Sequence, residues 1–225
     1  MEDPLLQTLP SKEQIQQLPI FQNLPLQQIQ VIHSLQQCHA IEQELKTCAL
    51  FGFDTESKPT FNKGEVSTGP HLIQLASRDK AYLFQISPAI LEFLKPIFEN
   101  KNQMKVGFGL KNDAHLFRKK GIELHNVIEL SKCFSAFGLS NPMGLKNAMA
   151  LLFQVNFPKS KKISTSNWAR KILTPHQIEY AAADAYAPVL VFEELLRLGL
   201  LPKTMTRHLF KLSMQPNTIK AETDA

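Results

Sequence analysis

The chain has 225 residues, of which 44% are hydrophobic, and a formal net charge of +5 at pH 7. This length can bury one substantial core, and the composition is that of a soluble globular protein. Its three cysteines are odd in number and widely spaced, which favours reduced thiols in a cytoplasmic protein over disulfides. The sequence has no histidine pair at zinc-ligand spacing, no Walker-type phosphate loop and no apolar run long enough to span a bilayer. A zinc enzyme, a nucleotide triphosphatase and a membrane protein are therefore disfavoured.

Residues 1–46 are rich in glutamine and are expected to form a helical N-terminal extension that packs against the domain that follows it. The run Ser11-Lys12-Glu13-Gln14 has the pattern of a capping box, which predicts one short helix. A second amphipathic helix is predicted because apolar residues recur at helical spacing at Leu26, Ile29, Ile32 and Leu35. A coiled-coil or partner-binding role for this extension is a weaker alternative.

Residues 47–200 predict a single α/β domain. Apolar runs at 48–53, 71–76 and 81–86 predict three consecutive antiparallel strands, with a turn at 77–80 between the last two. Further strands are predicted at 104–108 and 127–130, and helices at 88–99, 114–120, 142–153 and 175–198. This order predicts a mixed β-sheet flanked by α-helices. A last short helix and a flexible tail are expected in residues 201–225.

Two acids, Asp54 and Glu56, follow the first predicted strand. Side chains alternate along a strand, so these two carboxylates are expected to point the same way. Burying two acids without a counter-charge is costly, which favours a bound cation as the explanation. A solvated strand end is the alternative, since an Asp-x-Glu triplet arises easily by chance.

The helix predicted at 175–198 carries a tyrosine and an acid on one face. Thr174, Pro175 and Gln177 form a strong helix start, with a capping box and a proline at the first position. Tyr180 and Asp184 are four residues apart, so one site can contain both a phenol and a carboxylate. The surrounding alanines allow this helix to pack close to a sheet. An ordinary alanine-rich helix with one satisfied acid is the alternative.

Another acid, Asp113, follows the strand predicted at 104–108, and Asn112 is a natural N-cap for the next helix. For Asp113 alone, stabilisation of a helix end explains the residue better than catalysis does. The case for a metal-binding cluster therefore depends on the three segments together.

A basic loop precedes the last predicted helix and includes the only tryptophan. Acids alone would repel phosphate, so a basic loop beside them suits a site that cleaves a polyanion. We expect the tryptophan to anchor this loop and the lysines to face the phosphate backbone. The predicted nucleic-acid-binding residues are Lys111, Lys159, Lys161, Lys162, Trp168 and Arg170.

Three segments resemble the motifs of the DEDDy branch of the DnaQ-like 3'-5' exonucleases, the group that includes ribonuclease D and the Werner helicase exonuclease domain. They are Gly52-Phe53-Asp54-Thr55-Glu56, Val106-Gly107-Phe108 through Asp113, and Tyr180-Ala181-Ala182-Ala183-Asp184-Ala185-Tyr186. The loop 159–168 is similar as well, so the resemblance covers roughly residues 47–198. The sister branch has a histidine five positions before the last aspartate, where this chain has Glu179.

The resemblance implies a ribonuclease H-like fold and a metal-dependent 3'-5' exonuclease. Its substrate would be single-stranded or 3'-overhanging RNA or DNA with a free 3' end, and its products nucleoside 5'-monophosphates. Two ions, Mg²⁺ or Mn²⁺, would be involved. Asp54 would bridge both ions, Glu56 and Asp184 would complete the site of the nucleophilic water, and Asp113 would hold the second ion. Tyr180 would orient the water.

Two other functions stay open in the sequence. One is a catalytically weak nucleic-acid-binding or scaffold protein that retains the exonuclease fold, although the intact acids argue against it. The other is an endonuclease of the wider ribonuclease H-like group, which the pairing of Tyr180 with Asp184 disfavours. No residue identifies itself as a reader of the 2'-hydroxyl, so both RNA and DNA are possible substrates.

Overall fold

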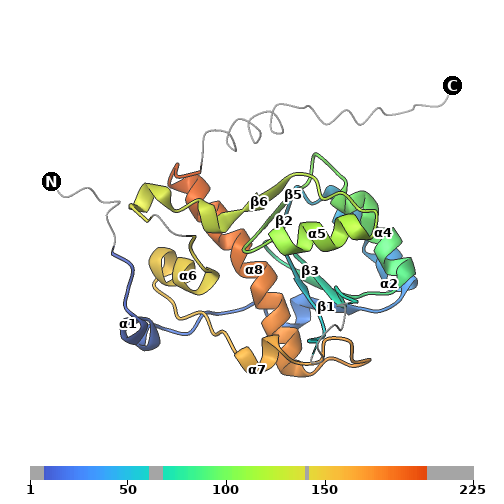
Figure 1. Cartoon of the computed structure of the whole chain (residues 1–225), viewed down its shortest axis with the longest axis horizontal. Coiled ribbons are helices and arrows are strands. Elements are labelled where there is room, and N and C mark those ends of the chain that lie inside the picture. Colours follow the sequence, from blue (N-terminus) through green and yellow to red (C-terminus); the bar gives the residue numbers. More distant parts are fainter. Residues whose placement is uncertain (1–7, 61–67, 140–141, 202–225) are drawn as a thin grey trace.

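The computed structural model describes residues 8–60, 68–139 and 142–201. Within these ranges, six strands form one mixed sheet in the order β1-β4-β3-β2-β5-β6 (Figure 1). Strand β3 is antiparallel to both β2 and β4, whereas the pairs β1–β4, β2–β5 and β5–β6 are parallel. The strands are β1 (Ile29–Ile32), β2 (Leu50–Glu56), β3 (Leu72–Ala76), β4 (Ala81–Gln85), β5 (Met104–Gly107) and β6 (Val127–Glu129). The predicted α/β class is confirmed.

Helices cover both faces of this sheet, with α8 lying along one face and α2, α4 and α5 on the other (Figure 1). The helices are α1 (Lys12–Gln17), α2 (Leu35–Ala40), α3 (Glu42–Thr47), α4 (Pro88–Phe98), α5 (Lys111–Lys119), α6 (Leu145–Phe153), α7 (Lys161–Ser164) and α8 (Pro175–Arg197). The four helices predicted in the catalytic domain are confirmed as α4, α5, α6 and α8. Helix α5 begins at Lys111 after Leu110, so the prediction of Asn112 as its N-cap is wrong. In the described ranges, none of the helices has the length and apolar character needed to cross a membrane.

The central strand β2 separates two layers of the core. Its alternating side chains place Phe51 and Phe53 in the cluster that also contains Phe117 of α5. A side chain at Gly52 would point to the opposite face, where its Cβ atom would lie 1.8 Å from the carbonyl oxygen of Ala185 in α8. The glycine therefore allows α8 to pack directly on the strand that carries the acids.

The N-terminal segment differs from the prediction. The capping box at Ser11 is confirmed and starts α1. The second predicted helix is wrong, because Leu26–Gln28 form a short 3-10 turn and Ile29–Ile32 form β1. Parallel pairing with Ala81–Phe84 supplies the backbone partners, and β-branched residues fit such a strand. The sheet thus begins inside the segment that the sequence assigned to the extension, whereas the helix expected beyond residue 201 lies outside the described residues.

Candidate active site

Two predicted acids lie at the end of the central strand. Strand β2 continues to Glu56, so Asp54 and Glu56 share the face on which Gly52 meets α8. The backbone N–H of Thr55 donates a hydrogen bond of 2.8 Å to Oδ1 of Asp54. The expectation that the two carboxylates point the same way is confirmed.

Helix α8 brings Tyr180 and Asp184 to the same place. Its start has the predicted capping box, in which the hydroxyl of Thr174 accepts a bond of 3.2 Å from the Gln177 N–H. Asp184, one turn after Tyr180, is only 3% exposed. Burial raises the pKa of Asp184, and the charge of Lys159 and a hydrogen bond from Tyr180 only partly offset this effect. These residues lie against the acids of β2.

The last acid, Asp113, lies in the first turn of α5 and accepts a hydrogen bond from the hydroxyl of Thr55. The loop before this helix is held by Glu129 at the end of β6. Its Oε1 accepts a hydrogen bond of 3.0 Å from the backbone N–H of Gly109, and its Oε2 accepts one of 2.8 Å from the backbone N–H of Leu110. Asp113 is thus positioned by contacts with β2 and β6.

The four carboxylates are close enough to disfavour one another's charge. Burial and the charges of Asp184, Asp113 and Glu56 raise the pKa of Asp54 well above its usual value. Burial, then the charge of Asp184, raise the pKa of Glu56 to about 8. Burial also raises the pKa of Tyr180, to which Asp184 and Glu56 add. The structure therefore brings all five predicted catalytic residues into one electrostatic cluster.

This cluster fits a divalent cation chemically. In the described part of the chain, no three His, Cys, Asp or Glu side chains are already arranged as metal ligands. Its donors are carboxylate oxygens, which Mg²⁺ and Mn²⁺ prefer, and their mutual repulsion would be relieved by positive charge. Oδ1 of Asp184 is buried and has no hydrogen-bond partner among the described residues, so it is available as a ligand.

Among the predicted basic residues, Lys159 is the one whose charge acts on the cluster. It lowers the pKa of both Glu56 and Asp184. The other cations are exposed, and no described contact links them to the acids: Lys111 at the start of α5, Lys161 and Lys162 on α7, and Arg170 in the following loop.

Trp168 is 1% exposed, which corrects its assignment to the nucleic-acid-binding set. Its indole N–H donates a bond of 3.1 Å to the carbonyl of Ser164, and its ring centroid lies 6.1 Å from that of Tyr180. A ring buried in this way has no free face for a base. Trp168 instead anchors the basic loop beside Tyr180.

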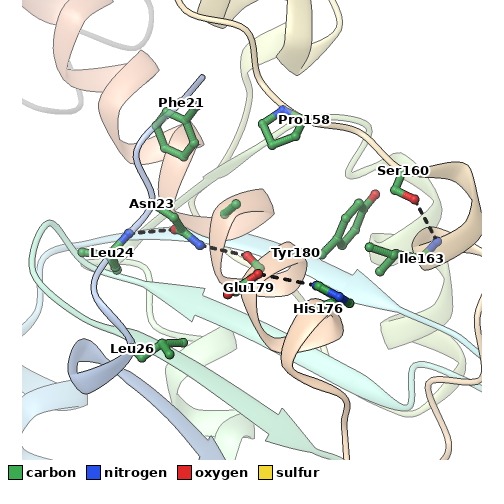
Figure 2. Close-up of a pocket in the computed structure, with 11 residues that line it drawn as sticks. Phe21, Asn23, Leu24, Leu26, Pro158, Ser160, Ile163, His176, Glu179 and Tyr180 are labelled. Atoms are coloured by element: carbon green, nitrogen blue, oxygen red, sulfur yellow. Dashed lines mark hydrogen bonds and ion pairs between the residues drawn. The ribbon is translucent and has the colours of Figure 1, made fainter. Parts of the chain in front are cut away.

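A cavity of about 310 Å³ is lined in part by Tyr180. Figure 2 shows Tyr180, Ser160 and Ile163 on one side of it and Phe21, Asn23 and Leu24 on the other. No sequence pattern predicts this cavity, because only the fold brings residues 21–26 next to α8.

Three residues around the cluster were missed in the sequence. Thr55 holds Asp113, Glu129 holds the loop before α5, and Gln74 lies opposite Asp54 on β3. For Gln74 a signal exists, because it is one polar residue in a strand whose five residues are all buried. Thr55 and Glu129 act on residues that are distant in sequence, so no local pattern reveals them.

Comparison with known proteins identifies the family. Residues 29–199, well over half of the chain, match the model of the 3'-5' exonuclease family. The chain is 32% identical over 169 residues to the bifunctional 3'-5' exonuclease/ATP-dependent helicase WRN of Mus musculus, covering 71% of this chain and 12% of that protein. It is 30% identical over 145 residues to a 3'-5' exonuclease of Arabidopsis thaliana, covering 62% of this chain and 50% of the relative. The chain thus spans half or less of the length of these two relatives.

Solved structures share the fold. The crystal structure of the Aedes aegypti Nibbler EXO domain has a TM-score of 0.69 at 21% identity, covering 84% of this chain and 100% of that domain. Escherichia coli RNase D has a TM-score of 0.61 at 21% identity, covering 82% of this chain and 50% of RNase D. The predicted ribonuclease H-like fold is confirmed, and the chain belongs to the 3'-5' exonuclease family.

Proposed function

We propose that this protein is a metal-dependent DEDDy-type 3'-5' exonuclease. It would remove nucleoside 5'-monophosphates from the free 3' end of single-stranded or 3'-overhanging RNA or DNA. The observation that carries this proposal is the meeting of four carboxylates and a tyrosine, from β2, α5 and α8, in one buried cluster. Lys159 supplies a positive charge at its edge.

The five residues divide into four that would bind ions and one that would orient the water. Asp54, Glu56, Asp113 and Asp184 would hold two Mg²⁺ or Mn²⁺ ions. Such ions lower the pKa of a bound water and neutralise charge that develops on the leaving oxygen. Because burial and the nearby carboxylates raise the pKa of Tyr180, its hydroxyl stays protonated at neutral pH. It therefore orients a water by hydrogen bonding and does not act as the base.

Lys159 would attract the phosphates of the substrate and would take no part in bond cleavage. An acidic cluster repels the phosphates it must cleave, and a cation at its edge offsets that repulsion. Both polymers remain candidate substrates: one solved relative is the Trypanosoma brucei RNase D complex with RNA U12, and another relative is an exonuclease joined to a helicase. The three free cysteines fit a reducing compartment such as the cytoplasm.

Degradation of 5'-labelled single-stranded RNA and DNA tests the proposal. The intact protein with Mg²⁺ or Mn²⁺ is expected to produce a ladder that shortens from the 3' end and to leave circular single strands intact. Asp54→Asn is expected to abolish the ladder, because the amide removes a charge from the cluster. Asp79→Asn, in the exposed turn between β3 and β4, is the matched control and should give the same ladder as the original, unsubstituted protein.

Either of two outcomes contradicts the proposal. A ladder that persists in Asp54→Asn would show that this cluster is not the catalytic centre. Binding of labelled strands without any shortening, with either ion, would favour a nucleic-acid-binding or scaffold protein.

A further inference from the structure

Gln74 is a buried residue whose side chain has no partner in the fold. It lies in the middle of β3, is 0% exposed and pairs directly with Asp54 across the antiparallel ladder. Neither its amide oxygen nor its amide nitrogen has a hydrogen-bond partner within residues 8–60, 68–139 and 142–201. A buried amide without partners is costly and rare in a folded protein.

The other buried glutamines show that the unpaired amide is specific to this position. The amide nitrogen of Gln103 donates to the carbonyls of Leu45 at 2.6 Å and Cys48 at 2.9 Å. Gln177 closes the capping box of α8 and donates to the hydroxyl of Ser166 at 2.9 Å. The fold therefore satisfies two of these three amides and leaves the one beside the acids unsatisfied.

The pairing of β2 with β3 defines the surroundings of this amide. Gln74 shares the face of Asp54, which is the face covered by α8, and its neighbours within the sheet on that face include the apolar side chains of Leu72, Ala76 and Leu83. Directly opposite residues in an antiparallel pair have Cβ atoms about 4.5–5.5 Å apart, within reach of a glutamine amide. Thr55 already holds Oδ1 of Asp54 from the backbone side. The ladder thus places the carboxylate of Asp54 directly opposite this amide.

We propose that Gln74 is a positioning residue for this cluster. Among the described residues the amide has no partner; when divalent ions bind, it hydrogen-bonds to the Asp54 carboxylate, directly or through one buried water, and sets the orientation in which that carboxylate holds the ions. The inference rests on the proposed function, and it explains why an amide stands where leucine or methionine would pack at lower cost.

Gln74→Met tests this role, because methionine has nearly the same shape and no amide. Mn²⁺ binding to the full chain is measured by titration calorimetry, and unfolding is measured by urea in EDTA. We expect the Mn²⁺ dissociation constant to rise by about 10- to 100-fold, as for other residues that orient metal ligands. The metal-free variant should be as stable as the original or more stable, because the native amide has no partner to lose.

Gln103→Met is the matched control with the opposite expectation. It leaves the carbonyls of Leu45 and Cys48 without a donor, so it should lose stability but keep the original Mn²⁺ affinity. An unchanged Mn²⁺ affinity in Gln74→Met, or a failure of that variant to fold, would overturn the proposal for Gln74. Failure of the proposed function is distinguishable, because the original protein would then neither bind Mn²⁺ nor shorten any strand.

The cavity beside Tyr180 carries a second, independent inference. Its outer wall is formed by residues 21–26, which precede the segment that matches the family, 29–199. This wall is built into the fold: the N–H of Phe21 donates to the carbonyl of Asn156 at 3.0 Å, and the amide of Asn23 donates to the carbonyl of Glu179 at 2.9 Å. The ring centroids of Phe21 and Phe157 lie 5.2 Å apart. The cavity is therefore preformed.

Its lining combines apolar surface with a few polar groups. Leu24, Pro158 and Ile163 supply apolar surface, and Ser160 and His176 add polar atoms. Tyr180 belongs both to this lining and to the acidic cluster, so the two sites are adjacent. Proteins that bind single strands combine a charged track for phosphates with apolar and aromatic surface for bases. A volume of about 310 Å³ is also in the range of small-ligand pockets.

We infer that this cavity receives a base of the substrate strand when a phosphate of that strand lies at the cluster. The inference depends on the proposed function. Strands with a single abasic residue at successive positions from the 3' end test it, with binding measured in the Asp54→Asn background so that no degradation occurs. An abasic residue at one particular position should weaken binding of the strand by about 5- to 150-fold, the range for loss of one stacked base.

Leu26→Ala should reduce this position-specific loss at least twofold, because Leu26 lines the cavity. Its side chain is 59% exposed, so its truncation leaves the core intact. Leu35→Ala, 40% exposed on α2, is the matched control and should leave the loss unchanged. Equal losses at every abasic position, or an identical profile in Leu26→Ala, would overturn the inference. An original protein that degrades no strand would instead contradict the proposed function.

Discussion

Tyr180 illustrates how one residue can act in hydrolysis without changing its own protonation. Burial raises its pKa, and the charges of Asp184 and Glu56 raise it further. A phenol held protonated in this way can donate a hydrogen bond throughout the neutral pH range. It cannot remove a proton from water at a useful rate.

Tyr180→Phe is therefore expected to lower kcat by about 100-fold, the usual effect of losing one oriented donor, while leaving Mn²⁺ affinity unchanged. At saturating Mn²⁺, which keeps Asp184 deprotonated even without the Tyr180 hydrogen bond, the pH dependence of the residual activity should keep the midpoints of the original protein, because the tyrosine does not titrate in that range. Steady-state rates between pH 6 and pH 9 check this. A shifted midpoint in Tyr180→Phe would show that the phenol does exchange a proton during the reaction.

Helix α5 begins with a cap from another element. No side chain near its own start caps it within the described residues, and Leu110 precedes its first residue. The carboxylate of Glu129 accepts the N–H groups of Gly109 and Leu110 instead. Because Asp113 lies in the first turn of this helix, the cap also holds a predicted ion ligand.

Glu129→Ala should lower the free energy of unfolding by roughly 2 kcal/mol, since one hydrogen bond to a charged group contributes about 1.5–3 kcal/mol and, of the two bonds, the one to Gly109 is exposed to solvent and contributes little. It should also weaken Mn²⁺ binding, because Asp113 loses its fixed position. Urea unfolding and calorimetric titration measure the two effects. Glu123→Ala, whose side chain is 74% exposed, is the control and should change stability by less than about 0.5 kcal/mol. Equal stability of the two variants would contradict the capping role.

The contact between α8 and β2 depends on the absence of a side chain. A Cβ atom at Gly52 would lie 1.8 Å from the carbonyl oxygen of Ala185 and 2.9 Å from Cγ2 of Val189. Gly52→Ala should therefore cost roughly 3 kcal/mol or more, because the backbone of α8 must move away. Displacement of α8 also moves Asp184 away from Asp54, so Mn²⁺ affinity should fall.

Gly144→Ala is the matched control for this contact. An added Cβ at Gly144 meets none of the described atoms within 4 Å. The substitution should cost less than about 1 kcal/mol, the scale of a changed N-cap residue. Similar thermal unfolding of the two alanine variants would show that α8 tolerates a side chain at Gly52.

Sequence patterns predicted those elements whose signals are local. Helix α8 was predicted because Thr174 and Gln177 form its capping box within four residues, and β2 because an apolar run ends at two acids. Strand β1 was predicted as a helix because its partner, β4, lies some fifty residues later, and pairing with that partner decides its conformation. The same limit explains why Glu129 was missed, since the loop that it caps is 20 residues away in the sequence.

Across the whole molecule, the candidate site combines the five residues that the sequence predicted as catalytic with a wall that the sequence did not predict. The acids and Tyr180 lie in motifs that are short and local in the sequence. Residues 21–26 reach the cavity only because β1 places the chain beside β4 and the preceding segment crosses α8. Predicting such a wall requires the order of strands in the sheet, which follows from the packing of the complete chain.

The charge of the cluster also links the stability of the whole protein to pH. The pKa of Glu56 is raised from 4.5 to about 8 in the folded protein, and those of Asp54, Asp113 and Asp184 are raised as well. Between the pKa of each group in the unfolded state and its higher pKa in the folded state, the folded protein thus binds more protons than the unfolded protein does. For such groups stability is fully present below the unfolded pKa and is lost as pH rises through the folded pKa.

In EDTA, the free energy of unfolding is therefore expected to fall as pH rises from about 4.5 to about 8, by up to roughly 1.4 kcal/mol per pH unit for each group. Excess Mg²⁺ should reverse this trend, because the ions bind the deprotonated carboxylates and only in the folded state. Urea unfolding at several pH values, with EDTA or with Mg²⁺, measures both slopes. Glu56→Gln isolates one group: its amide cannot titrate, so its slope in EDTA should be shallower than that of the original protein. A slope that is identical in Glu56→Gln, or unaffected by Mg²⁺, would mean that burial and mutual repulsion do not raise the pKa values of these carboxylates in the folded protein.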